Sequence, residues 1–243
     1  MAIAAAGPHA GNDVFVGDGS PEGVVTAGIG TLYLRSDGSS GTVLYIKESG
    51  TGSTGWKAAT TAGAVGANVD AVGSSFYRAN MPRNVVAGNL SALTTQVMLS
   101  TAIYLYAGDV VTNLTFLSGG TAANTPTNWW FALYDTASTP ALIAQTADQT
   151  STAWAANTPK TLALSAPYTV TTSGLHYASV MVKATAVPTL AGAAALENAA
   201  AAGAVVSGQK TLAQTSGSSL TATAPATITS GTAVVNVPLV IAT

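Results

Sequence analysis

"GLHYASVMVKA", residues 174–184, carries two alternating sets of side chains. One set occupies every second position: Leu175, Tyr177, Ser179 and Met181. The other set fills the positions between them: His176, Ala178, Val180 and Val182. Successive side chains of a β-strand point to opposite faces, so this period of two predicts a strand.

Similar segments follow one another from about residue 90 to the C-terminus. They are apolar runs separated by turns rich in Gly, Pro, Asn, Ser and Thr: "TTQVMLSTAIYLYA", "DVVTNLTFLS", "NWWFALYD", "ALIAQT", "TLALSAPYTV" and "GTAVVNVPLVIAT". About seven or eight strands at this spacing predict an antiparallel β-sandwich that resembles a jelly roll. We therefore expect an all-β protein.

A second β pattern lies in "GTLYLRSDGSSGTVLYIKESGTGSTGW", residues 30–56, whose two halves are alike and predict a β-hairpin. One face of this hairpin carries Leu32, Leu34, Leu44 and Ile46; the other carries Tyr33 and Tyr45, and Trp56 ends the segment. Burial of an aliphatic side chain contributes roughly 1.5–3 kcal/mol, whereas ordering each residue costs on the order of 1.5 kcal/mol. We therefore expect the hairpin to add to a sheet supplied by the body of the chain, by a neighbouring protein or by further copies of itself. Three hairpins around one axis would enclose the four aliphatic side chains and leave the two tyrosines outside.

These patterns divide the chain into three parts. Residues 1–56 are expected to form an N-terminal attachment arm and the hairpin. Residues 57–89 have neither a helical nor a strand period and are expected to be a connector. Residues 90–243 are expected to form the sandwich head. Within the head, the pattern assigns no role to the Ala-rich stretch 193–206.

The composition excludes several classes of function. Only 7% of the residues are charged and the formal net charge is −2, so no basic patch is present to bind nucleic acid. The chain has no cysteine, so neither disulfides nor thiolate metal sites are expected. The most apolar run is interrupted by Glu197 and Asn198, so no membrane insertion is expected. The first residues lack the pattern of a signal peptide, which predicts a soluble protein made in the cytoplasm.

No motif predicts a cofactor, a metal site or catalysis. Gly50–Gly55 matches G-x-G-x-x-G, but no amphipathic helix follows it, so a Gly-rich turn is the interpretation. The two histidines, His9 and His176, lack metal-ligand spacing, and no G-x-S-x-G elbow accompanies His176 for a Ser-His-Asp arrangement. We expect a non-enzymatic protein.

The acidic residues of the head leave two alternatives open. Asp109, Asp135 and Asp148 stand in turn-like contexts, which suits ordinary turn residues, and Glu197 is the remaining acid of this part. A pair of them could serve glycoside hydrolysis, and the same aspartates could help to hold a structural calcium ion.

The tryptophans of the head are candidates for glycan contact. In "NWWFALYD", Trp129 and Trp130 point to opposite faces of the strand, so one of them must leave the core side. Core or subunit-interface packing is one interpretation, because interfaces are enriched in Trp. Stacking of a sugar on Trp130 or Trp154 is the other.

Residues 19–56 closely resemble a segment that recurs in structural proteins of tailed bacteriophages. The segment has a GSPEGVVTA lead at 19–27, then G-(T/S)-L-Y-x-R-x-D-G at 30–38 and L-Y-x-K-x-S-G-x-G-x-x-G-W at 44–56. The later chain, from "STAIYLYAGDVVTNLTF" through "WWFALYD" and "TADQTSTAWAANTPKTLAL" to "PLVI", is more loosely similar to the sandwich head of actinobacteriophage minor tail or fibre-like proteins. The resemblance implies a non-enzymatic virion component, usually trimeric, whose N-terminal part docks and whose head is displayed.

Residues and resemblance together predict a phage virion protein made in the host cytoplasm. Its expected partners are further copies of itself in a homotrimer and other proteins of the tail or capsid. A capsid-displayed head fibre or decoration protein is the alternative within the structural class. A module that binds glycans of the host surface is the alternative of another class.

Overall fold

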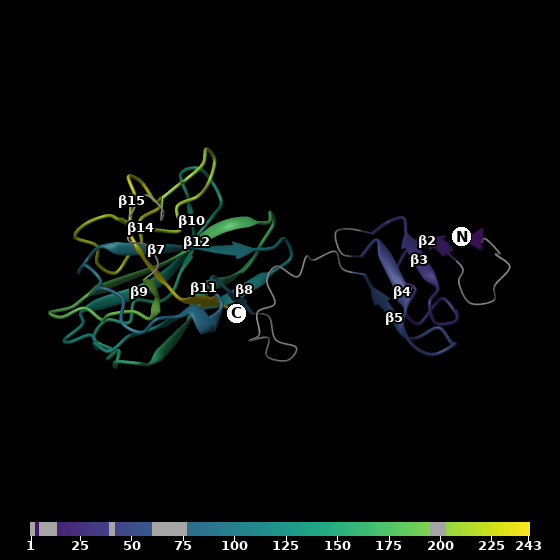
Figure 1. The fold of residues 1–243 in the computed structure, drawn as a ribbon, viewed down its shortest axis with the longest axis horizontal. Helices are drawn as coiled ribbons and strands as arrows, with labels where there is room; N and C mark the ends of the chain where they lie inside the picture. Colours follow the sequence, from purple (N-terminus) through teal and green to yellow (C-terminus); the bar gives the residue numbers. More distant parts are fainter. Residues whose placement is uncertain (1–2, 5–13, 39–41, 60–76, 195–202) are drawn as a thin grey trace. The chain divides into compact units, whose positions relative to one another are not determined.

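The computed structural model describes residues 3–4, 14–38, 42–59, 77–194 and 203–243. The chain divides into two compact units, Met1–Ala67 and Asn68–Thr243, here called the N-terminal unit and the head (Figure 1). Each unit has its own sheets and its own core.

The N-terminal unit contains one five-stranded sheet in the order β1-β2-β3-β4-β5. Its strands are β1 (Ile3–Ala4), β2 (Val14–Gly17), β3 (Leu32–Arg35), β4 (Leu44–Lys47) and β5 (Trp56–Ala58). β2 and β3 pair in parallel, and the other pairs are antiparallel. The predicted hairpin is β3–β4, with Tyr33 opposite Tyr45, but further strands flank it on both sides.

The core of the N-terminal unit is aromatic. Tyr33, Tyr45 and Trp56 are buried and meet edge to face, with ring centroids 6.0–6.3 Å apart for the two pairs that include Tyr33. The expectation that the tyrosines lie outside and that the hairpin lacks a core of its own is therefore wrong. It failed because it counted aliphatic side chains alone, whereas aromatic rings bury more area each.

The head is a sandwich of two sheets. The first sheet has the order β10-β9-β12-β7-β14-β15, and the second has the order β11-β8-β17-β6. The bounds are β6 (Arg78–Ala79), β7 (Met98–Leu105), β8 (Val110–Leu117), β9 (Asn128–Tyr134), β10 (Leu142–Gln145), β11 (Pro159–Thr169), β12 (Gly174–Lys183), β14 (Ala213–Ser216), β15 (Thr232–Ala233) and β17 (Val240–Ala242). A small pair, β13 (Gly192–Ala194) with β16 (Asn236–Pro238), and a 3-10 turn at Arg83–Val85 complete the described elements.

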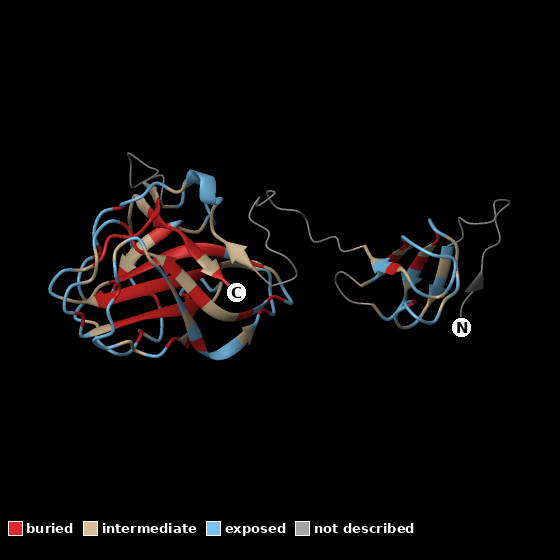
Figure 2. Cartoon of the chain, turned by 90° about the horizontal axis from the view of Figure 1, so that it is seen from below, coloured by how far each residue is buried: buried red, intermediate tan, exposed pale blue. Residues whose placement is uncertain are grey.

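The main core lies between the two sheets of the head. Trp129 stacks on Trp154 at 5.0 Å between ring centroids, and Phe131 contacts Phe116 of the second sheet at 4.8 Å. Leu133 completes the inward-facing row of β9. Figure 2 shows the buried strands in the middle of the head. The all-β sandwich expected from the alternating patterns is confirmed.

A second core covers the other face of the six-stranded sheet. Trp130 and Tyr134 of β9 lie there, packed with Met181 of β12 and against Ala224 and Ile228 of a segment far along the chain. This sheet is therefore buried on both faces, which explains why "NWWFALY" is apolar at consecutive positions.

The structure does not leave all of residues 57–89 as a connector, because residues near both ends of this range belong to strands. Lys57 and Ala58 belong to β5, and Arg78–Ala79 forms β6, which pairs with β17 of the head. Leu90 is buried in the main core. Within the Ala-rich stretch 193–206, Ala193 and Ala194 belong to β13, while residues 195–202 lie outside the described residues.

Candidate functional site

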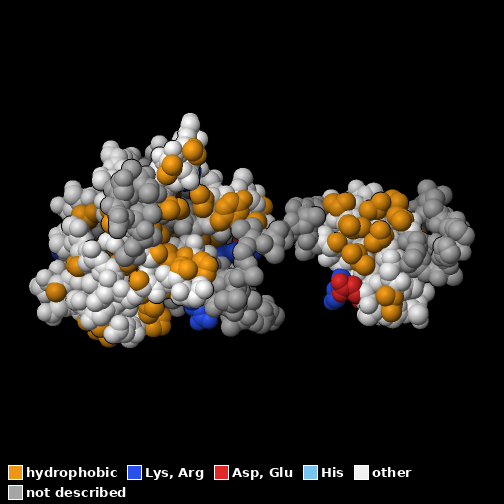
Figure 3. Space-filling model, in the orientation of Figure 1, with side chains coloured by type: hydrophobic (Ala, Val, Ile, Leu, Met, Phe, Trp, Pro, Cys, Tyr) orange, Lys and Arg blue, Asp and Glu red, His pale blue; other side chains and the backbone are white. Residues whose placement is uncertain are grey.

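The sheet of the N-terminal unit presents an aliphatic face. Its residues form two rows across β2, β3 and β4: Val14, Leu32 and Ile46 in one row, and Val16, Leu34 and Leu44 in the other. Val14, Val16 and Leu34 remain 38–40% exposed. Figure 3 shows hydrophobic side chains gathered over these strands. The four aliphatic residues predicted to share one face do so, and β2 adds two valines.

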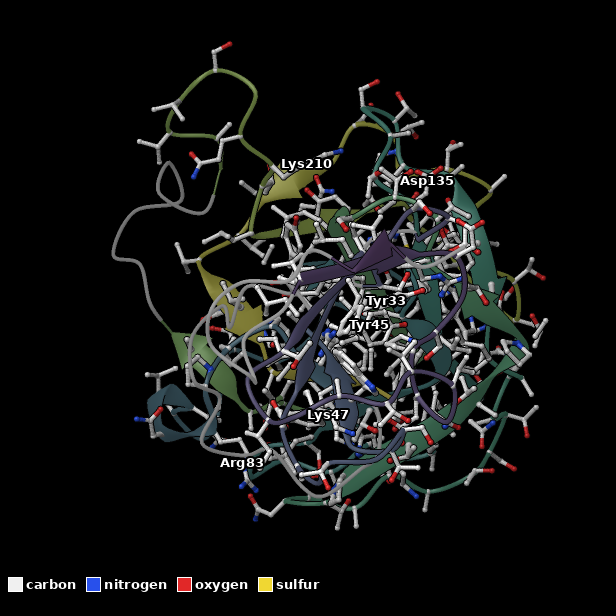
Figure 4. All side chains as sticks on the ribbon, turned by 90° about the vertical axis from the view of Figure 1, so that its right-hand side faces the viewer. Tyr33, Tyr45, Lys47, Arg83, Asp135 and Lys210 are labelled. Carbon is white, nitrogen blue, oxygen red and sulfur yellow. The ribbon has the colours of Figure 1, made fainter. Side chains whose placement is uncertain are left out.

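Two loops cover the opposite, aromatic face. The indole N–H of Trp56 donates to the Val25 carbonyl at 2.7 Å, and the Tyr33 hydroxyl donates to the Asp18 carbonyl at 3.2 Å. The loops also join each other, because the Gly23 amide donates to the Ser53 carbonyl at 2.8 Å. Tyr33 and Tyr45 are labelled in Figure 4. Among the residues that the structure describes, loops cover the aromatic face, whereas the aliphatic face has no covering segment and keeps Val14, Val16 and Leu34 exposed to solvent.

Lys47 is fully buried beneath the Gly-rich loop 48–55. Its ammonium donates to the carbonyls of Gly52, at 2.6 Å, and Thr54, and lies 5.7 Å from the centroid of the Trp56 ring. The loop therefore turns carbonyl oxygens toward a cation. A phosphate site needs backbone N–H donors instead, so the Gly-rich turn, rather than a nucleotide fingerprint, fits G-x-G-x-x-G here. In the sequence, the signal for the buried contact of Lys47 with the loop is its position two residues after Tyr45, which places both side chains on the same face of β4.

Two carboxylates, those of Glu22 and Asp37, join separate parts of residues 19–56. Glu22 accepts hydrogen bonds from the amides of Gly55 and Trp56, and these bonds lower its pKa. Asp37 accepts from the Arg35 guanidinium at 2.6 Å and from the Gly19 amide at 2.8 Å, which lowers its pKa to about 2. Glu22 and Asp37 thus stabilise the fold of the N-terminal unit, a role that the sequence analysis does not assign to them.

Trp130 and Trp154 do not offer a sugar platform. Both side chains are fully buried. The Trp130 indole N–H donates to the Thr221 carbonyl at 2.7 Å, and that of Trp154 donates to the Thr158 carbonyl at 3.1 Å. The hypothesis of glycan contact at these two residues is contradicted because each faces a core, and the interpretation as core residues holds.

The aspartates of the head are engaged in local hydrogen bonds. Asp109 pairs with the Arg78 guanidinium at 2.8 and 2.9 Å. Asp135 accepts from the Ala141 amide at the end of β9, whereas Asp148 accepts from the Trp129 amide at its start. Six extended residues separate these two positions by about 20 Å, which exceeds the spacing of a glycosidase pair. Glu197 lies outside the described residues.

The described part of the chain contains no group of three or more His, Cys, Asp or Glu side chains that could hold a metal ion. No helix within these residues has the length and apolarity needed to cross a bilayer. His9 lies outside the described residues.

His176 is buried, and its Nδ1 lies 3.1 Å from the Gly174 carbonyl. Burial lowers the pKa of His176 from 6.5, a direction that Lys210 reinforces and that the Gly174 carbonyl and Asp135 oppose. The unfolded chain therefore takes up a proton near pH 6.5 that the folded head resists.

This difference predicts that the head loses stability as the pH falls through about 6.5. The thermal midpoint of the wild type, measured by circular dichroism, should drop between about pH 7.5 and about pH 5.5. A His176→Gln variant should show a smaller drop over the same interval. Equal drops in both proteins would assign the pH dependence to other groups. Asp37 and Glu22 do not contribute, because their lowered pKa values place their effect at more acidic pH.

No protein-family model matches the chain, and no curated protein matches it.

Proposed function

We propose that the protein is a non-enzymatic structural component of a bacteriophage virion, a tail or fibre-like protein. The N-terminal unit docks, and the sandwich head is displayed. Two observations support this proposal: the resemblance of residues 19–56 to a segment of phage structural proteins, and the uncovered aliphatic face. The second carries the argument, because a folded unit with an open apolar sheet face is suited to binding protein.

The aliphatic face suits self-association into the proposed homotrimer. Its six side chains are uncharged, so copies of it would not repel each other. Three sheets that turn this face toward a common axis would exclude Val16, Leu34 and their neighbours from water in a closed, symmetric assembly. The aromatic face would then point away from the axis, already covered by the loops of the same chain.

Location on the particle tests the proposal most directly. Gold-labelled antibody against the head should decorate intact virions in electron micrographs. Label along the tail supports the tail or fibre-like role, and label over the capsid supports the head fibre or decoration alternative. Complete absence of the protein from purified particles would overturn both.

A charge placed on the aliphatic face should block assembly. Val16→Asp is expected to convert a trimer to monomers in native mass spectrometry and to prevent incorporation into particles, because a carboxylate would be desolvated at the axis. Val24→Asp is the matched control, since Val24 is 77% exposed and lies outside this face. Equal incorporation of both variants, or a wild type that is monomeric and absent from particles, would refute the role of the face.

A further inference from the structure

The described part of the head begins with residues 77–80, here called the entry segment. In the chain they follow residues 60–76, which connect them to the strands of the N-terminal unit. Within the entry segment, Arg78–Ala79 forms β6, the edge strand of the second sheet, which pairs with β17. An edge strand of two residues makes few backbone hydrogen bonds, so by itself it would open readily.

The guanidinium of Arg78 fastens the entry segment to the turn between β7 and β8. It donates two hydrogen bonds to the Asp109 carboxylate, at 2.8 and 2.9 Å, and its Cζ lies 5.0 Å from the centroid of the Tyr106 ring. Asp109 is buried, with 8% of its surface exposed, and it also accepts from the Tyr106 amide at 2.9 Å. Two parallel hydrogen bonds to a carboxylate hold an arginine more strongly, and in a more definite orientation, than one bond between neutral groups.

Asn80 fastens the entry segment to both sheets of the head. Its side-chain Nδ2 donates to the Pro238 carbonyl at 2.8 Å and to the Thr101 hydroxyl at 3.2 Å. Its Oδ1 accepts from the Val240 amide at 3.0 Å, and its own backbone amide donates to the Val240 carbonyl at 3.2 Å. Thr101 belongs to β7 of the first sheet and Val240 to β17 of the second, so the contacts of this one residue reach both layers of the sandwich.

Strand β15 shows that a short edge strand does not need such contacts. It also has two residues, Thr232–Ala233, and it forms the edge of the first sheet. In the described part of the chain, no side-chain hydrogen bond joins these two residues to the rest of the head. β6 instead pairs with β17, which lies inside the second sheet next to β8, near the end marked C in Figure 1. The additional contacts therefore belong to the edge strand through which the chain enters the head.

We propose that the entry segment is a mechanical clamp, which carries tension between a docked N-terminal unit and the displayed head. Any force that the chain transmits between the two units passes through residues 77–80, because residues 60–76 enter the head there. Arg78 and Asn80 distribute this force to both sheets, so that it does not peel β6 from β17. The inference rests on the proposed function, since tension arises only where the N-terminal unit is anchored.

Force spectroscopy on the full chain tests the clamp. One handle is attached at the N-terminus and the other at Ala153→Cys, an exposed position in a chain without native cysteine. Beyond the entry segment, the next backbone hydrogen bonds to the rest of the head join Ala87 to Gly192, so opening of the clamp would release residues 77–86. The release should lengthen the chain by about 35 Å. The wild type should not show this step before the head unfolds, whereas Asp109→Asn and Asn80→Ala should show it at least about tenfold more often.

Asp37→Asn is the matched control, because it weakens the Arg35–Asp37 pair of the N-terminal unit and leaves the entry segment unchanged. It should behave like the wild type in the search for the short step. Hydrogen exchange separates a local clamp from a general loss of stability: amides of residues 78–80 should lose protection in Asp109→Asn and Asn80→Ala, while those of β7 and β12 keep it.

Two results would overturn the clamp. One is a wild type that already opens by the short step at low force. The other is a pair of variants in which β7 and β12 lose as much protection as residues 78–80, since these contacts would then serve only the stability of the whole head. Either result leaves the labelling of virions unchanged as the test of the proposed function, and absence of the protein from particles would refute that function without altering the force measurement on the purified chain.

Discussion

Lys47→Met is expected to unfold the N-terminal unit and leave the head intact. The ammonium is buried and donates to two carbonyls of the Gly-rich loop, and methionine would leave Gly52 and Thr54 without these donors. Hydrogen bonds to charged groups contribute roughly 1.5–3 kcal/mol each, so the loss is about 3–6 kcal/mol. A small unit with a core of three aromatic rings has little stability to spare.

Hydrogen exchange of backbone amides measures this effect in each unit separately. Amides of β3 and β4 should lose protection in Lys47→Met, while those of β7 and β12 should keep it. Lys57→Met is the matched control, because Lys57 is exposed on the neighbouring strand β5. Retained protection in β3 and β4 of Lys47→Met would show that the loop closes without the ammonium.

Trp130→Ala is expected to lower the free energy of unfolding of the head by about 3–5 kcal/mol. The indole is fully buried in the second core, and its N–H satisfies the Thr221 carbonyl. Removing it opens a void between β9 and the segment that covers the sheet. Chemical denaturation followed by circular dichroism gives the difference from the wild type.

Tyr104→Ala is the control for loss of an aromatic ring from the same sheet. Tyr104 lies on β7 and is 45% exposed, so its removal should cost less than about 1 kcal/mol. Trp130→Phe should fall between the two, because it keeps most of the ring and loses the hydrogen bond. An unchanged stability in Trp130→Ala would contradict the buried role of the indole.

Much of the strand content could be predicted because alternation is a local property. Residues 174–183 form β12, as their period of two indicates, and Trp129 and Trp130 point to opposite faces of β9. The hairpin β3–β4 forms where the two similar halves of residues 30–56 predict it, and its four aliphatic side chains share one face; the register, Leu32 opposite Ile46 and Leu34 opposite Leu44, comes from the structure.

The parallel pairing of β2 with β3 could not be predicted, because fourteen residues separate the two strands and the turn signals among them, such as Asp18-Gly19, do not specify a parallel crossover. The residues that bury Trp130 could not be predicted either, because they lie far from it in the sequence. They are Leu220, Ala224 and Ile228, which are spread through the polar stretch "SGSSLTATAPATITS". No short window of sequence contains both the tryptophan and its cover.

The sequence by itself determined which side chains share a face, because the backbone geometry of a strand fixes that alternation. Only the tertiary structure decided which face is buried. In the N-terminal unit both faces of the hairpin are apolar, and the choice depended on loops 18–31 and 48–55, which close over the tyrosines through Lys47 and Glu22. Burial depends on what distant segments bring to a surface, so the aromatic face became the core and the aliphatic face remained open.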